Sequence, residues 1–128
     1  MLKGIHHVAI ICSNIEQSKQ FYMETLGFQL LAEVYRSERA SWKVDLSLSG
    51  QYCLELFSFP NPPPRVSGPE AAGLRHLAFS VTNLEVWIEQ LYAKGVICEP
   101  IRIDPYTGAK FTFCADPDGL PVEFYEVQ

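Results

Sequence analysis

Hydrophobic and polar positions along the chain follow two periods, and the elements they predict come in the same order twice. Residues 5–12 form a continuous β-branched run, which is typical of a buried strand. Asn14 is a candidate N-cap for a helix over residues 15–26, which Gly27 closes. Apolar runs separated by turn residues then predict three further strands, at residues 28–35, 42–48 and 52–59.

The second half repeats this order after a proline-rich segment. The prolines between residues 60 and 69 remove backbone donors and fix φ, so this segment is a connector. Asn83 is the candidate cap of a helix that ends near Gly95, and the turn at residues 116–119 leads into the last strand. The strands predicted for this half lie at residues 75–81, 96–103, 110–114 and 121–127.

This layout predicts an α+β fold in one domain, built from two βαβββ modules. Module one spans residues 1–59, the linker spans 60–73 and module two spans 74–128. Each module has one helix to cover one face of its strands, so the other faces must be buried elsewhere. We expect the modules to form a curved sheet or open barrel around a metal cleft.

The repeat extends to individual residues that carry chemistry. His7-Val-Ala returns as His76-Leu-Ala, and each copy is followed by a glutamate inside an apolar strand, at Glu55 and Glu123. The intervals are 48 residues from 7 to 55 and 47 residues from 76 to 123. A carboxylate in such a strand is costly without a partner, and a divalent cation supplies one.

Taken singly, a histidine or glutamate in a strand is more often structural or solvent-facing than a ligand. Two of each at matching offsets favour one metal site made by His7, Glu55, His76 and Glu123. This nitrogen and oxygen set suits Zn, Ni, Co, Mn or Fe(II). His6 has the opposite strand parity to His7, and we expect it not to bind the metal.

Composition narrows the class of partner. A net charge of −5 over 128 residues argues against nucleic acid or a membrane as a partner, because both need concentrated Lys and Arg. The four cysteines form no C-x-x-C pair, which favours reduced, buried thiols in a cytoplasmic protein. The candidate substrate residues are weaker predictions, because scattered surface charge explains most of them better; they are Arg36, Trp42, Arg75 and Lys110.

The motifs around the four candidate ligands resemble the vicinal oxygen chelate superfamily, which holds glyoxalase I, ring-cleaving dioxygenases and bleomycin-resistance proteins. The resemblance covers essentially the whole chain and is strongest to the bacterial YaeR-type branch of glyoxalase-I-like metalloproteins, through His-His-Val-Ala, Leu-Glu-Leu-Phe, Leu-Arg-His-Leu-Ala and Pro-Val-Glu-Phe. It implies one divalent metal per site, with Zn or Ni favoured over Co, Mn or Fe. It also implies a homodimer and a small-molecule substrate.

The same resemblance predicts a function and shows where this chain departs from it. Bacterial glyoxalase I holds glutathione with an arginine and an asparagine at the positions of Ile11 and Phe59 here. We therefore predict a metal-dependent lyase or isomerase that does not use glutathione, with Glu123 or Glu55 moving a proton next to a carbonyl. The alternatives are an Fe(II) ring-cleaving dioxygenase and a non-catalytic drug- or metabolite-binding protein of the bleomycin-resistance type.

Overall fold

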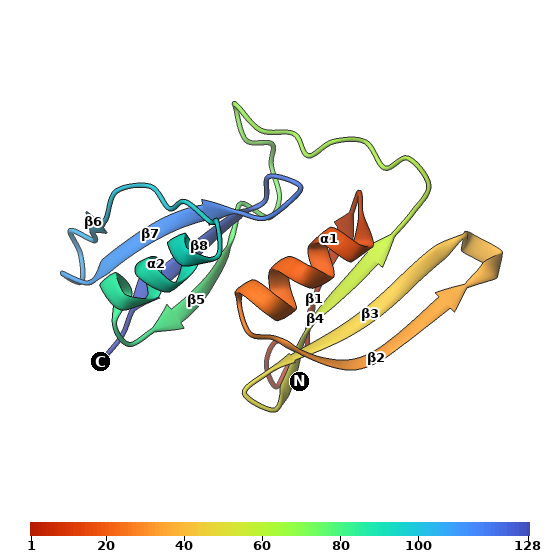
Figure 1. Cartoon of the computed structure of the whole chain (residues 1–128), viewed down its shortest axis with the longest axis horizontal. Helices are drawn as coiled ribbons and strands as arrows, with labels where there is room; N and C mark the ends of the chain where they lie inside the picture. The colour runs from red at the N-terminus through yellow and green to blue at the C-terminus, as the bar shows by residue number, and fades with distance from the viewer. The chain divides into compact units, whose positions relative to one another are not determined.

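Each half of the chain folds into a four-stranded sheet with one helix on one face (Figure 1). The computed structural model describes all residues from Met1 to Gln128 and divides them into two units, Met1–Pro64 and Arg65–Gln128. The first unit contains β1 (Val8–Cys12), α1 (Ile15–Gln20), a π-helical turn (Phe21–Thr25), β2 (Gln29–Arg36), a 3-10 turn (Ser37–Arg39), β3 (Ser41–Leu48) and β4 (Gln51–Ser58). The second contains β5 (Leu77–Val81), α2 (Leu84–Ala93), β6 (Arg102–Ile103), β7 (Lys110–Ala115) and β8 (Pro121–Glu126).

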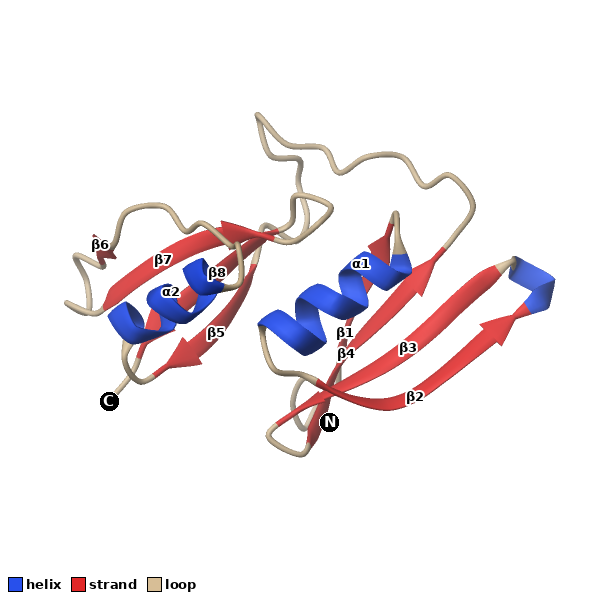
Figure 2. Ribbon diagram, in the orientation of Figure 1, coloured by secondary structure: helices blue, strands red, loops and turns tan.

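The two sheets have the same topology. Their strand orders are β1-β4-β3-β2 and β5-β8-β7-β6, and in each the first strand runs parallel to the last strand of its unit (Figure 2). The predicted α+β class and the repeated strand–helix–strand order are therefore confirmed. No strand of one sheet pairs with a strand of the other, so the sheets are not closed into a barrel.

Strand alternation sorts the side chains of the first sheet onto two faces. Val44, Leu46, Leu54 and Leu56 are buried, whereas their neighbours Lys43, Asp45, Glu55 and Phe57 are only partly covered. The buried set packs beneath α1 and the π-helical turn that follows it, in which Tyr22 is fully buried. Each buried leucine contributes about 1.5–3 kcal/mol to folding through the apolar surface it removes from water.

The second unit has the same two faces. Val122 and Phe124 of β8 are buried with Leu84 and Leu91 of α2, and the ring of Trp87 meets that of Phe124 at 5.5 Å between centroids. The alternate β8 residues, Glu123 among them, lie on the face away from the helix. We call this second surface of each sheet its helix-free face.

Asparagine caps begin both helices, as predicted. The side chains of Asn14 and Asn83 accept hydrogen bonds from the backbone N–H groups of Gln17 and Val86, at 3.2 and 3.1 Å. Gly27 and Gly95 follow the helical segments with φ of +92° and +84°, a region that glycine adopts without strain.

Two of the predicted elements differ from the structure. The helix expected over residues 15–26 is α-helical only to Gln20 and then continues as the π-helical turn. The strand expected over residues 96–103 is wrong except for Arg102 and Ile103. Pro100 cannot donate to a ladder, and only Glu99 ties the preceding segment to β7: its N–H donates to Phe113 O, and its carbonyl accepts from Thr112 Oγ1. No helix of the chain has the length and apolar character needed to span a membrane.

Candidate metal centre

His7 and Glu55, which we call the first pair, come together on the helix-free face of the first sheet. β1 lies parallel to β4 with Ala9 opposite Glu55, and His7 directly precedes β1. His7 Nε2 lies 3.8 Å from Glu55 Oε1, with the glutamate side chain 12% exposed. The strand register therefore fixes the distance between two residues that are 48 positions apart in the sequence.

Glu55 is held by neighbours on β3 and β4 that the sequence analysis did not single out. The Tyr52 hydroxyl donates to Glu55 Oε2 at 3.0 Å, and Lys43 Nζ lies 3.3 Å from the same oxygen. Lys43 also contacts both oxygens of Asp45 at 2.9 Å, and Asp45 is the cross-strand neighbour of Glu55. The signal available in the sequence was Lys43 and Asp45 at alternate positions of a strand whose positions between and beside them, Trp42, Val44 and Leu46, are apolar.

The protonation states in this cluster follow from burial and charge. Burial, followed by the carboxylates of Glu55 and Asp45, raises the pKa of the Tyr52 hydroxyl, which therefore remains a donor. The hydrogen bond to Asp45, helped by Glu55, raises the pKa of the Lys43 ammonium. One cation thus lies between two carboxylates.

The imidazole of His7 is also fixed on both sides. It stacks on Tyr52 with 5.3 Å between centroids and 11° between planes, and its Nδ1 lies 2.8 Å from Nδ1 of His6. His6 in turn meets the Tyr52 ring edge-on at 5.3 Å. With Nδ1 engaged by His6, the Nε2 atom is the one directed at Glu55.

His76 and Glu123, the second pair, reproduce this arrangement in the second unit. Ala78 lies opposite Glu123 in the parallel β5–β8 ladder, as Ala9 lies opposite Glu55 in the first. His76 Nε2 lies 3.0 Å from Glu123 Oε2. His76 directly precedes β5, so both pairs have the same register as well as the same residue types.

The surroundings of the second pair are less polar. Phe113 is the cross-strand neighbour of Glu123 and packs edge-on against His76 at 5.1 Å, where the first unit has Asp45. No lysine or tyrosine contacts Glu123, and His76 Nδ1 is buried without a hydrogen-bond partner. The repeat has therefore produced two pairs of the same geometry with different neighbours.

The candidate substrate residues lie in different places within their own units. Arg36 reaches the helix-free face of the first sheet, whereas Trp42 lies on the opposite face of β3, beside Tyr35 at 5.2 Å. Lys110 forms an ion pair with Glu85 of α2 at 2.5 Å. Arg75 is exposed and precedes His76.

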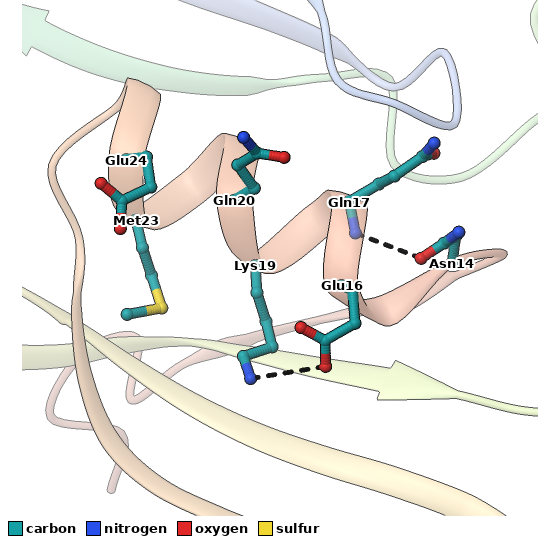
Figure 3. A pocket seen from close by; sticks show the side chains of 7 residues that line it. All are labelled: Asn14, Glu16, Gln17, Lys19, Gln20, Met23 and Glu24. Atoms are coloured by element: carbon teal, nitrogen blue, oxygen red, sulfur yellow. Dashed lines mark hydrogen bonds and ion pairs between the residues drawn. The ribbon is translucent and has the colours of Figure 1, made fainter.

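Two surface hollows, one in each unit, are lined by residues outside the two pairs. One, of about 440 Å³, follows the outer surface of α1 and the π-helical turn, between Asn14 and Glu24 (Figure 3), and a smaller one of about 320 Å³ lies at the start of α2. The side chains of the first include Lys19, which is paired with Glu16 in the same helix. Neither hollow is lined by a candidate metal or substrate residue.

The residues of each pair suit a divalent metal. A nitrogen and an oxygen that bind one ion at about 2.1 Å lie about 3.0 Å apart at right angles and about 3.4 Å apart in a tetrahedron. The observed separations are 3.0 Å in the second pair and 3.8 Å in the first. No three or more His, Cys, Asp or Glu side chains are placed so that they could hold a metal ion together, and each unit by itself brings together two of the four predicted ligands.

Comparison with known proteins decides the family. The family sequence model of the glyoxalase/bleomycin resistance protein/dioxygenase superfamily matches residues 4–124 of the chain. The chain belongs to this superfamily. This member is 60% identical to the YwkD protein of Bacillus subtilis and 58% identical to the YaeR protein of Escherichia coli. Both matches cover 98% of this chain, and they cover 98% of YwkD and 97% of YaeR.

Solved structures agree with the assignment. The superfamily member superposes on the crystal structure of a glyoxalase family protein from Enterococcus faecalis with a TM-score of 0.91, at 51% identity and covering 97% of this chain and 98% of the other. A curated 2-epi-5-epi-valiolone epimerase from Actinomyces is 27% identical over 94% of this chain and 77% of its own length. The Listeria monocytogenes fosfomycin resistance protein FosX, solved with Mn(II), shares the fold at 18% identity, with a TM-score of 0.75 and 100% and 95% of the chains covered.

Proposed function

We propose that this superfamily member is a glyoxalase-like metalloenzyme, a lyase or isomerase that moves a proton next to the carbonyl of a small vicinal-oxygen substrate. The observation that carries the proposal is the repeated His–Glu pair, with Ala9 opposite Glu55 and Ala78 opposite Glu123. A structural repeat conserves fold, but it gives no reason to keep an imidazole beside a partly buried carboxylate in both copies.

In this proposal His7, Glu55, His76 and Glu123 together hold one divalent ion. The mixed nitrogen and oxygen donors and the 3.0 Å separation within the second pair suit Zn or Ni, and also Co, Mn or Fe, whereas the first pair would have to close from 3.8 Å. When bound, the ion would polarise the substrate carbonyl as a Lewis acid. FosX, which shares the fold, binds Mn(II).

The neighbours of the two glutamates support different roles for them. Glu55 accepts from Tyr52 and lies beside Lys43, and these contacts hold its carboxylate in one orientation. Glu123 has only His76 as a polar partner and lies beside the Phe113 ring. We therefore propose that Glu55 remains a fixed ligand. A Glu123 carboxylate oxygen takes the proton from the carbon next to the carbonyl and returns it to the neighbouring carbon.

The glutathione-independent part of the proposal rests on the residues of the helix-free face. Ile11 is 56% exposed there, and Phe59 stacks on Phe57 at 5.8 Å, so this face is apolar at both positions. Neither side chain can donate to a carboxylate or amide of glutathione. A smaller substrate without a peptide suits this surface better.

Elemental analysis and solvent exchange test the proposal together. We expect wild-type protein purified without chelator to contain close to one Zn or Ni per chain, and His7→Ala to lose it. Glu123→Gln should keep the metal but stop exchange of the substrate's α-proton with deuterium from solvent. Glu85→Gln, the same change at an ion pair of α2, is the matched control and should alter neither.

The same measurements separate the alternatives. Predominant iron together with oxygen uptake on catechols would favour the ring-cleaving dioxygenase. Absence of metal after reconstitution, with tight binding of a small molecule and no turnover, would favour a non-catalytic binding protein. Full exchange activity in both Glu123→Gln and Glu55→Gln would contradict the proposed roles.

We also propose a cytoplasmic homodimer. All four cysteines are free thiols, as expected for a reducing compartment. β2 is an edge strand of the first sheet that leaves Leu31 and Tyr35 55% and 50% exposed, and an apolar edge of this kind is normally covered by a partner. Light scattering after size-exclusion chromatography should give about twice the 14.5 kDa mass of the chain.

A further inference from the structure

The guanidinium of Arg36 lies on the helix-free face of the first sheet without a counter-ion. It sits 4.7 Å from the centre of the Phe57 ring and 5.9 Å from that of Phe59. Its Nη2 donates to Ser41 Oγ at 3.0 Å, while its Nε is buried and has no acceptor. No carboxylate lies within ion-pair distance, and of the five N–H donors of the guanidinium only one, on Nη2, has a protein acceptor.

The second unit contains an arginine in a similar setting that does have a counter-ion. Arg102, on the topologically equivalent strand β6, lies over Phe111 at 5.0 Å and Phe113 at 5.3 Å. Its Nη2 also forms an ion pair with Glu99. Stacking on two phenyl rings thus occurs in both units, but only in the second does the protein supply the anion.

The position of Arg36 relates it to the first pair. Phe57 follows Glu55 by two residues on β4, so both side chains are on the helix-free face and one same-face step of about 7 Å apart. The guanidinium lies over the Phe57 ring, so Phe57 borders both the cation and, along β4, the position of Glu55. A ligand that reaches from the first pair to the cation would therefore pass beside an apolar ring.

We propose that Arg36 binds the distal carboxylate of an acidic substrate, whose vicinal oxygens are received beside His7 and Glu55. The planar guanidinium matches a carboxylate in shape and charge, and a ligand carboxylate would compensate the cation that the protein leaves unpaired. The substrate class is a short 2-oxo or 2-hydroxy dicarboxylic acid with an apolar spacer. Binding of the distal carboxylate by Arg36, which we call the acid subsite, needs no metal. The placement of the vicinal oxygens beside His7 and Glu55 rests on the proposed function.

Two ligands that differ only at the distal end provide the test. 2-Oxoglutarate and 2-oxopentanoate have the same chelating group and chain length, but the second ends in a methyl group. On metal-loaded protein, calorimetry should give an affinity for 2-oxoglutarate about 10–100 times higher, the usual effect of one charged hydrogen-bonded contact. Arg36→Met should remove this preference and leave the metal content and the affinity for 2-oxopentanoate unchanged.

Arg102→Met is the matched control, because it removes the same stacking group where a counter-ion is already present. It should keep the preference for 2-oxoglutarate. Arg36→Lys, which retains the charge without the planar fork, should keep part of it, and urea unfolding checks that each variant is folded. Equal affinities for the two acids in the wild type, no binding of either, or a preference that survives Arg36→Met would overturn the proposal.

A metal-free arm separates failure of this inference from failure of the proposed function. Glutarate is added to metal-free, ¹⁵N-labelled protein, and the Arg36 Nε–H signal is followed after assignment by its loss in Arg36→Met. A saturable shift in protein that takes up no metal would refute the metalloenzyme and support the acid subsite. Normal metal uptake with no shift and no acid preference would refute the subsite alone.

Discussion

Replacing Tyr52 by phenylalanine removes one oxygen from the cluster around the first pair. The hydroxyl donates to Glu55 Oε2 at 3.0 Å and lies 3.2 Å from Asp45 Oδ1. The ring itself remains, so the stack on His7 at 5.3 Å is retained. The variant therefore tests the hydrogen bonds to the carboxylates and leaves the packing intact.

The size of the effect follows from the neighbours that remain. A hydrogen bond to a charged group contributes about 1.5–3 kcal/mol, and Lys43 still lies 3.3 Å from Glu55 after the change, so the lower value applies. We expect the metal-free protein to lose about 1.5 kcal/mol of unfolding free energy. If Glu55 is a metal ligand, loss of a group that orients it should lower metal affinity about tenfold.

Urea unfolding of metal-free protein and competition with a chelator for Ni²⁺ measure the two quantities separately. Tyr125→Phe is the matched control, because Tyr125 donates to Asp104 at 2.9 Å and contacts Thr107 without touching a candidate ligand. It should reduce stability and leave Ni²⁺ affinity unchanged. Unchanged affinity in Tyr52→Phe, or the same loss in both tyrosine variants, would refute the role assigned to the hydroxyl.

Three further predictions concern charge, thiols and capping. Lys43→Met should destabilise metal-free protein by about 1–2 kcal/mol, because Asp45 and Glu55 then face each other without a cation. For the same reason, adding Ni²⁺ should raise the Tm of this variant more than that of the wild type. Burial raises the pKa of Cys114 to about 12, so its thiol should resist iodoacetamide at pH 8 in native protein and react in urea. Asn83→Ala removes the side-chain acceptor of the first turn of α2 and should cost about 1 kcal/mol in urea unfolding, whereas Asn83→Ser should restore most of it.

Much of the fold could be predicted because local signals and long-range repetition agreed. The capping asparagines, the glycines after the helices and the strand alternation each act over a few residues, and the second copy repeated every one of them. The strand predicted over residues 96–103 was wrong because the prediction gave more weight to the apolar residues of this segment than to Pro100. In the structure most of the segment pairs with no neighbouring strand.

The candidate centre was predictable only in part. The repeat identified His7, Glu55, His76 and Glu123, and each unit brings its two together. The different settings of Glu55 and Glu123 could not be read from the sequence, because they depend on which residue lies opposite each one, Asp45 in one ladder and Phe113 in the other. The missing counter-ion of Arg36 likewise depends on side-chain positions beyond its own strand.

The π-helical turn explains why the two copies differ in length by one residue. From the capping asparagine to the closing glycine there are 13 positions in the first copy (14 to 27) and 12 in the second (83 to 95). Outside the helix the counts agree: seven from each histidine to its asparagine, and 28 from each glycine to its glutamate. One residue has thus been gained or lost since the copies diverged, and the widened turn at Phe21–Thr25 accommodates it.

A strand could not have absorbed that residue in the same way. A slip of one position along β4 would have turned Glu55 into the apolar core and brought a leucine to the helix-free face. A helix that changes pitch for a single turn passes no such shift to the strands on either side. Comparative alignments of the two halves should therefore place their one gap inside the helix, and variation in helix length among relatives can be tolerated without moving the histidine relative to the glutamate.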